Sequence, residues 1–385
     1  MKITLASLDH FHIADQARSI QSSGDLDHYY TTRIRESKDG IRDELGTSCY
    51  PLHYALRVMQ RKPKWVGGNH YYLGLCRAFD AWLLTQFSRK TDILTVLSGV
   101  GLHSLRAARK NGILTVIDCG STHTDFQHDV LTEEFARNGI RAPLFPEAYR
   151  DRVRREFEEA DYIQLPSQFV INTFLNRGIP QSKIIRAAYG VNLSLFAPSP
   201  ELDLNRPFRV ICPSGVNLRK GARVLAEAWR KLEWQDAELR WIGTPDEFSK
   251  HLFNKPIPGL IFERHRSHQA LAELYRSCDV FVLPSFEEGL ARVMLEAAAS
   301  GLPLIATPNT GVEDFFTAGT PEGWLIPTND VDALCQALTE ARADREKTFQ
   351  LGQRAAERAQ AFSWDAYGEK VRANYEKILK HNGSK

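Results

Sequence analysis

The chain has 385 residues, of which 43% are hydrophobic and 25% are charged. This length exceeds what one hydrophobic core usually organises, so we expect a globular protein of two domains. The formal net charge is only +2. Without a broad positive field, we expect no nucleic acid partner.

The six cysteines are scattered, and none stands in a Cys-x-x-Cys pair. This excludes the common zinc and thioredoxin-like patterns, and we expect reduced thiols in a cytoplasmic protein. Polar residues begin at Asp9, which is too early for the apolar core of a signal peptide. No apolar run is long enough to span a bilayer.

Short apolar runs alternate with amphipathic, helix-like stretches along the chain. Eight of these runs are predicted strands: residues 2–7, 93–98, 113–118, 161–166, 208–213, 238–243, 279–284 and 302–307. Most are rich in Val, Ile and Leu, as in strands that are buried on both faces. Strands that alternate with helices predict an α/β fold with parallel sheets.

The two halves of the chain carry a similar signature. An Asp-led apolar strand ends in Leu-Pro-Ser at residues 160–167 and again at residues 278–285. Together with the strand count, this repeat predicts two Rossmann-like domains that face a central cleft.

A proline-rich segment without periodicity, residues 197–207, is the predicted linker between the domains. It divides the chain into an N-terminal domain over residues 1–198 and a C-terminal domain over residues 206–362. Residues 363–385 form a tail that is predicted to be helical and begins with a serine cap.

The most informative stretch is PSFEEGLARVMLEAAASGLP at residues 284–303. A loop through Glu288 follows a predicted strand, and a helix that contains Glu296 then runs to about Ser300. Ligands of parallel sheets bind at the carboxyl ends of the strands, and free amides at a helix N-terminus attract anions. If the segment between the two glutamates is helical, it spans about 12 Å, the length of a diphosphate with a sugar on either side.

Two acidic groups beside a diphosphate need basic groups opposite. Arg219 and Lys220 lie in the loop after the predicted strand at 208–213, directly before Gly221. Both side chains suit phosphate oxygens. The alternatives are ordinary: an acid at a helix start offsets the helix dipole, and a basic pair in a loop is usually solvated. The placement of both groups after strands of one predicted sheet favours a binding site.

The stretch at 284–303 resembles the retaining glycosyltransferases of family 4, also called group 1, whose fold is GT-B. The family pattern is Pro-Ser, then Glu-Gly, then a second Glu eight residues after the first, and this chain matches it without a gap. Weaker similarities lie at residues 189–198, 219–221, 307–316 and 323–334. The resemblance covers roughly residues 105–365 and is more specific in the second half.

The resemblance implies a role for each matching residue. Glu296 would bind the ribose hydroxyls of a nucleotide sugar, and Glu288 would contact the donor sugar as a catalytic residue. Lys220, also catalytic, and Arg219 would neutralise the leaving diphosphate. The distal phosphate would lie on the amides of Gly289, Leu290, Ala291 and Arg292. The tail helix would cross back to the N-terminal domain.

The resemblance also implies a catalytic histidine in the loop after the strand at 113–118. His123 is the match, and it would face the anomeric carbon across the cleft. Taken alone, a histidine in a loop is more often structural. His128 is the second candidate, because it falls past the strand end in a helix-like stretch.

The loop after the first strand departs from the family pattern. Family members often have a glycine-rich loop there, where the acceptor approaches, whereas residues 7–19 contain no glycine. The acceptor therefore stays open. Asp9, His10 and His12 would either touch it or cap the helix that begins near Ala14.

The resulting hypothesis is transfer of a sugar from a UDP- or GDP-sugar to a hydroxyl of a carbohydrate or lipid-linked acceptor. The anomeric configuration would be retained, and the pathway would be polysaccharide biosynthesis. The basic residues can stabilise the leaving group without a metal, so we expect no obligatory metal or cofactor. Asp-x-Asp pairs at 25–27 and 330–332 are predicted in a surface loop or at a helix start.

Two other function classes stay open. A nucleotide-sugar epimerase would need no acceptor, and a phosphorylase would usually carry pyridoxal phosphate. A non-catalytic nucleotide-sugar-binding module would have no need of His123. Basic and aromatic residues at 57–65 leave peripheral contact with the inner face of a membrane open. A solvated surface is the alternative, because Pro63 interrupts any long amphipathic helix.

Overall fold

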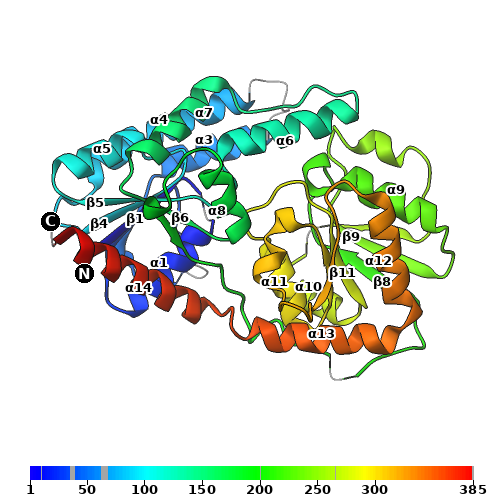
Figure 1. Ribbon diagram of the computed structural model, residues 1–385. Helices are drawn as coiled ribbons and strands as arrows, with labels where there is room; N and C mark the ends of the chain where they lie inside the picture. Colours follow the sequence, from blue (N-terminus) through cyan, green and yellow to red (C-terminus); the bar gives the residue numbers. More distant parts are fainter. Residues whose placement is uncertain (10, 35–39, 62–67, 200, 265, 384–385) are drawn as a thin grey trace.

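The computed structural model describes residues 1–9, 11–34, 40–61, 68–199, 201–264 and 266–383. Two α/β units lie side by side, and each is built on one sheet with helices on both faces (Figure 1). The predicted fold class is therefore confirmed. In this described part of the chain, no helix is long and apolar enough to cross a membrane.

Within the described residues, the first sheet has seven parallel strands in the order β3-β2-β1-β4-β5-β6-β7. The strands are β1 (Ile3–Ser7), β2 (Leu26–Thr31), β3 (Gly46–Ser48), β4 (Ile93–Leu97), β5 (Leu114–Asp118), β6 (Tyr162–Leu165) and β7 (Ile184–Arg186). The helices around them are α1 (His12–Ser22), α3 (Tyr50–Arg61), α4 (Gly68–Gln86), α5 (Leu102–Lys110), α6 (Thr124–Arg137), α7 (Glu147–Glu159) and α8 (Gln168–Leu175). Strands β1 and β4 are buried along their whole length, as their apolar runs predicted.

Three strands of this sheet were not predicted, and their sequences show why. Strand β2 carries polar residues in its first half, and β3 and β7 are only three residues long. The expectation that Asp25 lies in a surface loop is wrong. Its carboxylate is buried, accepts a hydrogen bond from the N-terminal ammonium of Met1 at 3.2 Å and pairs with Arg372 at 2.9 Å.

The second sheet, as far as the chain is described, has six parallel strands in the order β10-β9-β8-β11-β12-β13. They are β8 (Phe208–Cys212), β9 (Ala237–Ile242), β10 (Leu260–Glu263), β11 (Val280–Leu283), β12 (Leu304–Ala306) and β13 (Gly323–Leu325). Its helices are α9 (Ala222–Leu232), α10 (His268–Arg276), α11 (Arg292–Ala299), α12 (Val331–Ala343) and α13 (Arg345–Ala359). The short strands β10 and β13 at the two edges were not predicted, and Asp330 caps α12 as expected of a helix start.

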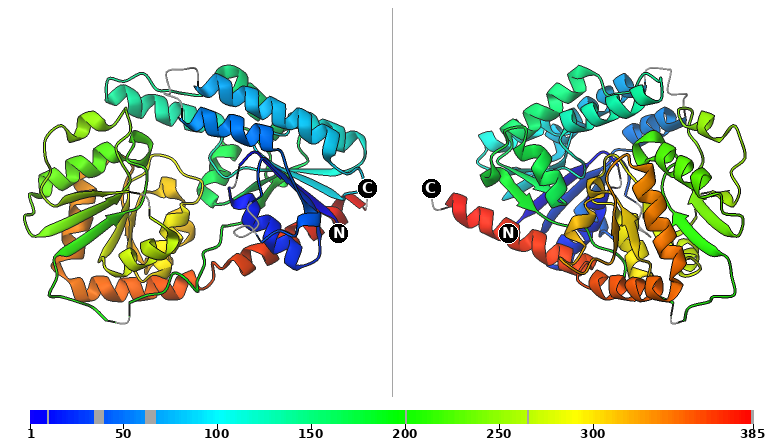
Figure 2. Two further views of the ribbon diagram at one scale, coloured as in Figure 1. Left: turned by 180° about the vertical axis from the view of Figure 1, so that it is seen from behind. Right: turned by 45° about the vertical axis from the view of Figure 1, so that its right-hand side comes forward.

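Helix α14 (Trp364–Gly383) links the two units along their base. It follows α13 of the second unit and packs on α1 of the first unit (Figures 1 and 2). The hydroxyl group of Tyr375 accepts a hydrogen bond from Gln16 Nε2 at 3.0 Å and lies 2.9 Å from Thr95 Oγ1. The chain thus crosses between the units twice, and the amide of Val191, which lies shortly before the first crossing, donates to Phe362 O on the second at 2.8 Å.

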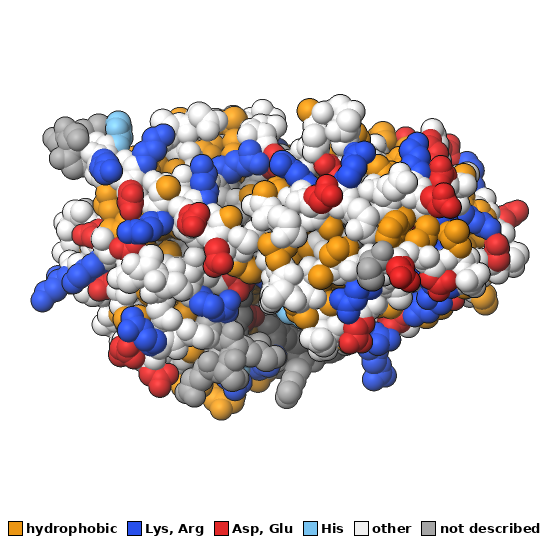
Figure 3. Space-filling model, turned by 90° about the horizontal axis from the view of Figure 1, so that it is seen from below, with side chains coloured by type: hydrophobic (Ala, Val, Ile, Leu, Met, Phe, Trp, Pro, Cys, Tyr) orange, Lys and Arg blue, Asp and Glu red, His pale blue; other side chains and the backbone are white. Residues whose placement is uncertain are grey.

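The hydrophobic core runs across the boundary between the units. One cluster joins the core of the first sheet to one face of the second sheet, including Phe281 and Leu283 of β11. The alternate residues Val280 and Val282 point to the other face and belong to a second cluster with α9 and α12. Seen from below, acidic and basic side chains are interspersed over the surface, without one large patch of a single sign on that face (Figure 3).

Candidate active site

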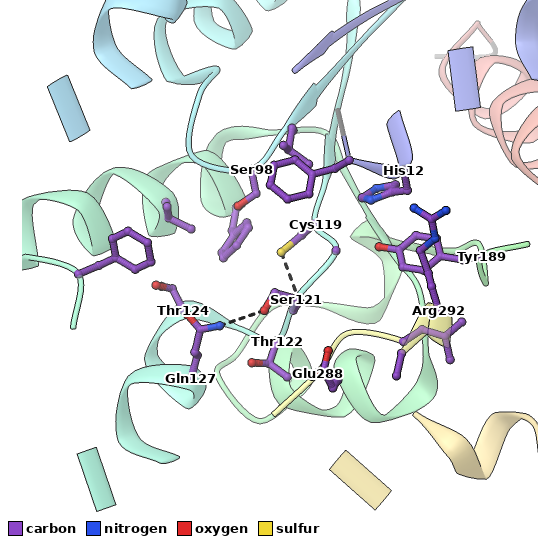
Figure 4. Close-up of a pocket in the computed structure, with 18 of the residues that line it drawn as sticks. His12, Ser98, Cys119, Ser121, Thr122, Thr124, Gln127, Tyr189, Glu288 and Arg292 are labelled. Carbon is purple, nitrogen blue, oxygen red and sulfur yellow. Dashed lines mark hydrogen bonds between the residues drawn. The ribbon is translucent and has the colours of Figure 1, made fainter. Parts of the chain in front are cut away.

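A cavity of about 450 Å³ lies between the two units (Figure 4). The first unit lines it with segments that follow strands β1, β4 and β5 and with side chains of α4 and α7. The second unit contributes Lys220, Glu288 and residues 290–293. The cavity therefore lies at the carboxyl ends of strands from both sheets, which is where open parallel sheets bind their ligands.

Helix α11 begins later in the chain than the sequence predicted. Its first residue is Arg292, and Glu288 to Ala291 form a loop before it. The length of about 12 Å was derived for continuous helix and does not apply to this segment. The amide of Ala291 already donates to Thr310 O at 3.2 Å. Among the described residues, the amides of Gly289, Leu290 and Arg292 have no hydrogen-bond acceptor, and Leu290 and Arg292 line the cavity.

The loop that carries the basic residues is held against this segment by a glycine. Arg219 and Lys220 lie in a short 3-10 turn that Asn217 caps, and Gly221 ends this turn with φ of 77°. A Cβ atom on Gly221 would lie 2.1 Å from Pro284 O, so only glycine allows the two loops to approach this closely. The predicted proximity of the two loops is therefore present in the structure.

Lys220 reaches the carboxylate of Glu288 with its ammonium group. Arg219 Nη1 donates to Glu287 O at 3.0 Å and to Glu287 Oε2 at 3.1 Å. Burial, followed by the positive charge of Arg219, lowers the pKa of Lys220 to about 7, although Glu287 acts in the opposite direction. An incoming anion would therefore favour the protonated form of Lys220.

Glu287 is a contact between the units that the sequence did not reveal. Its side chain is fully buried, and its Oε1 accepts from Ser121 Oγ at 2.7 Å and from Thr122 Oγ1 at 2.8 Å. Burial alone would raise its pKa, but Arg219 and the hydrogen bonds from Ser121, Gln127 and Thr122 hold the pKa at about 2. Glu287 was not predicted, because the sequence pattern points to Glu288. The only sign of Glu287 in the sequence is that it directly precedes another glutamate.

The two predicted glutamates have different surroundings. Glu288 lines the cavity, whereas Glu296 lies one helical turn inside α11, does not line the cavity and is only 8% exposed. Its Oε2 is 3.5 Å from Tyr275 OH. Burial raises the pKa of Glu296 to about 7 despite the opposing effects of Arg292 and Tyr275.

His123 does not lie where the sequence predicted. It caps helix α6, where its Nδ1 accepts a hydrogen bond from the amide of Asp125 at 3.3 Å. Its ring packs against Phe157 and Phe174 and is not part of the cavity lining. Burial, the largest effect, lowers its pKa to about 4. Capping and aromatic packing thus hold His123 away from the cavity, and His128 lies on the partly exposed side of α6.

Another histidine reaches the cavity instead. His12 is the first residue of α1, lines the cavity and pairs with Asp118 at the end of β5. The sequence offered it only as a residue that touches an acceptor or caps the helix. His10, the other histidine of that loop, lies outside the described residues. Within the described ranges, no group of three His, Cys, Asp or Glu residues could hold a metal ion.

Comparison with known proteins agrees with this geometry. Residues 207–344 match the family model described as glycosyl transferases group 1. This segment begins just before β8 and ends after α12, so it contains the basic loop, both predicted glutamates and the start of α11.

Two curated relatives are similar over both units. The putative colanic acid biosynthesis glycosyltransferase WcaL of Escherichia coli K12 is 26% identical over an alignment of 296 positions, and the match covers 66% of this chain and 71% of the relative. A GDP-mannose-dependent alpha-mannosyltransferase of Mycobacterium tuberculosis is 28% identical over an alignment of 286 positions, and the match covers 72% of this chain and 70% of the relative.

Solved structures share the whole fold. Sucrose-phosphate synthase of Thermosynechococcus elongatus superposes with a TM-score of 0.72 at 18% identity and covers 99% of this chain and 100% of its own. HepE of Anabaena, solved with UDP and glucose, has a TM-score of 0.66 at 15% identity and covers 98% and 100%. The fold is thus that of GT-B glycosyltransferases, and the comparisons together support a glycosyltransferase enzyme.

Proposed function

We propose that this protein is a retaining glycosyltransferase that moves a sugar from a nucleotide-diphosphate sugar to the hydroxyl group of an acceptor. One observation carries the proposal: Lys220, Glu288 and the start of α11 border one cavity whose other walls belong to the first unit. Cationic groups and free amides on one wall suit a diphosphate. The space opposite can hold the sugar and the acceptor.

The leaving diphosphate would be stabilised by charge and by fixed dipoles. We assign this role to Lys220 and Arg219, together with the amides of Gly289, Leu290 and Arg292. Ala291 contributes through the helix dipole while its amide donates to Thr310. When the bond from the anomeric carbon to the diphosphate breaks, the oxygen that keeps the electron pair becomes more negative. Donors that are already in place stabilise this charge without rearrangement.

The two glutamates would bind opposite ends of the donor. Glu288 accepts hydrogen bonds from hydroxyls of the transferred sugar. It does so either while it still contacts Lys220 or after that contact has broken. Glu296 accepts from the ribose hydroxyls, with the hydroxyl group of Tyr275 nearby. A buried carboxylate that gains two hydroxyl donors is compensated for its lost hydration.

The donor is proposed to be a UDP-sugar or a GDP-sugar, without an obligatory metal or cofactor. HepE is solved with UDP, and the mycobacterial relative is named for its dependence on GDP-mannose, so both bases have support. A carbohydrate acceptor in glycan biosynthesis agrees with the name of WcaL. A lipid-linked acceptor and work at the inner face of the membrane belong to the same proposal. Most of the basic segment at 57–65 that motivates membrane contact lies outside the described residues.

The domain boundaries of the proposal are 1–198, 206–362 and 363–385. The first two segments each hold one sheet, and the third holds α14. In this division, the units would move relative to each other about the second crossing, at residues 360–363, when the cavity closes on substrates.

A turnover assay tests the proposed reaction. The protein is incubated with UDP-glucose and with GDP-mannose, with and without oligosaccharide acceptors, and release of UDP or GDP is measured. A transferase releases the diphosphate faster with an acceptor, and the new linkage keeps the anomeric configuration of the donor in the NMR spectrum. Conversion of the donor sugar without release of diphosphate would instead indicate an epimerase. Loss of turnover in EDTA that magnesium or manganese restores would contradict the absence of an obligatory metal.

A further inference from the structure

Two buried side chains of the first unit form a second wall of the cavity, apart from the residues assigned above, and a third buried side chain contacts one of them. They are His12, Asp118 and Tyr189, and none of them was predicted to contact the donor. His12 and Tyr189 line the cavity on the side of Arg292 (Figure 4). All three are at most 5% exposed.

Asp118 fixes the orientation of the His12 ring. Its Oδ1 is 2.5 Å from His12 Nε2, and its Oδ2 accepts from Gln164 Nε2 at 2.6 Å. Because a carboxylate only accepts, the ring carries its proton on Nε2. The other ring nitrogen, Nδ1, has no hydrogen-bond partner in the described part of the chain and is left as an acceptor in the neutral ring.

Tyr189 offers the complementary group. Its ring centroid lies 4.5 Å from that of His12, and its buried hydroxyl has no partner among the described residues. Burial raises the pKa of this hydroxyl well above its usual value, so it keeps its proton and can donate it. A buried hydroxyl without a hydrogen-bond partner costs free energy of folding. A ligand that accepts a hydrogen bond from it would offset this cost.

The two groups converge on one small space beside Gly120. A Cβ atom on Gly120 would lie 2.6 Å from the Tyr189 hydroxyl, 2.9 Å from His12 Cε1 and 3.3 Å from His12 Nδ1. Gly120 also faces Gly289 of the second unit, since a Cβ atom on Gly289 would lie 2.0 Å from Gly120 O. The space is therefore next to the amides that are proposed to hold the distal phosphate.

We propose that His12 Nδ1 and the Tyr189 hydroxyl together bind one hydroxyl group of the transferred sugar. This inference rests on the function proposed above. A sugar hydroxyl can donate to Nδ1 and accept from Tyr189 at the same time, whereas an unprotonated phosphate oxygen has no proton to donate. The pair thus selects a hydroxyl, and the group that follows the distal phosphate in a nucleotide sugar is the sugar.

His12, and not the predicted His123, is thus the histidine that lines the cavity. It is a binding residue that touches the donor sugar, and Asp118 acts through it as a positioning residue. The glycine at position 120 leaves the space open, because any side chain there would meet both polar groups. The signal in the sequence was weak, since His12 and Asp118 are 106 residues apart.

The test separates binding of the sugar from binding of the diphosphate. Affinities of UDP, UDP-glucose, GDP and GDP-mannose are measured by calorimetry for the wild type, for Tyr189→Phe and for Tyr367→Phe. Tyr367 is the matched control, a buried tyrosine that does not line this cavity. We expect Tyr189→Phe to weaken the sugar nucleotide by about three- to tenfold, the effect of one hydrogen bond, and to leave the diphosphate unchanged.

The outcomes are distinct. Equal effects of Tyr189→Phe on the sugar nucleotide and the diphosphate, or no effect on either, would overturn the assignment while leaving the proposed function intact. Failure of the wild type to bind any of the four compounds would instead contradict the proposed function, and this inference with it. Tyr189→Phe removes a hydroxyl that has no partner among the described residues, so its melting temperature should not fall. Gly120→Ala fills the same space and should reproduce the selective loss for the sugar nucleotide.

Discussion

Glu287 of the second unit and Ser121 of the first unit are joined by a hydrogen bond of 2.7 Å in a fully buried position. The same carboxylate pairs with Arg219 of its own unit. One side chain therefore contacts both the first unit and the basic loop of the second unit. A ligand that attracts Arg219 therefore competes with Glu287 for the same cation.

Replacing Glu287 with Gln should destabilise the contact between the two units. We expect the free energy of unfolding to fall by about 2–3 kcal/mol, less than for a fully buried pair because Arg219 is 34% exposed. Urea unfolding measures this loss, and the exposed Glu247→Gln is the control. In small-angle X-ray scattering, the variant should have a larger radius of gyration. An unchanged radius and an unchanged unfolding midpoint would contradict the role of Glu287.

The low pKa of Glu287 predicts a dependence of stability on pH. Its pKa is about 2 in the folded protein and 4.5 as the ordinary value, so the contribution to stability is complete above the ordinary value and is lost as the pH falls toward 2. The difference in melting temperature between the wild type and Glu287→Gln should therefore shrink between pH 5 and pH 2.5. A constant difference over this range would exclude an ionised Glu287 as its cause.

Lys220 predicts a dependence of binding on pH. Its pKa is lowered to about 7, and only the protonated form attracts a diphosphate. The affinity for UDP or GDP should be highest below pH 7 and should fall by up to about tenfold per pH unit above it, until the pKa of the complex is reached. Calorimetry between pH 6.5 and 9 measures this. Lys220→Arg, which stays charged, should abolish the slope, and an equal slope in that variant would assign it to another group.

Glu296 predicts a conflict between stability and binding. Burial raises the pKa of Glu296 from 4.5 to about 7, so the folded protein favours the protonated carboxyl group. This contribution to stability is complete below pH 4.5 and is lost as the pH rises through 7. Glu296→Gln should raise the melting temperature at pH 8 more than at pH 5, and it should weaken nucleotide binding. If Glu296→Gln instead lowers the melting temperature at pH 8, neighbouring groups such as Arg292 already stabilise the charged form of Glu296.

Helix α14 should contribute to the stability of the first unit. Tyr375 is fully buried between α14, α1 and β4, and Tyr375→Ala should cost about 3–5 kcal/mol in the free energy of unfolding, as for other large aromatic residues in cores. The exposed Glu369→Ala on the same helix is the control. If both variants unfold at the same urea concentration, α14 does not stabilise the first unit through Tyr375.

Much of the fold could be predicted because its signals are local. Continuous apolar runs such as those of β4 and β11 identified the central strands, and the glycine and proline at 301–303 marked the end of α11. The edge strands β3 and β13 were missed because three residues carry too little pattern. The two loops of the second sheet that reach the cavity were predicted to lie together because Lys220 and Glu288 follow strands closely.

The parts of the site that were missed depend on contacts between distant residues. No periodicity links His12 to Asp118, or Glu287 to Ser121, and only the packed units bring them together. His123 was misplaced because sequence position alone does not reveal whether a side chain caps its own helix or points into a cleft. Glu296 was predicted from spacing, but its high pKa comes from its burial in the packed unit, which Arg292 and Tyr275 only partly oppose.

The most direct test of the central claim is a comparison of melting temperatures with UDP, GDP, ADP and TDP. Wild type, Lys220→Ala and Glu296→Ala are compared, with the exposed Lys231→Ala as control. A ligand at 100 times its dissociation constant adds about 2.7 kcal/mol to stability. We predict that one nucleotide raises the melting temperature of the wild type and of Lys231→Ala, but not of the two site variants. No shift with any nucleotide, or a shift that both site variants retain, would contradict a donor site at Lys220 and Glu296.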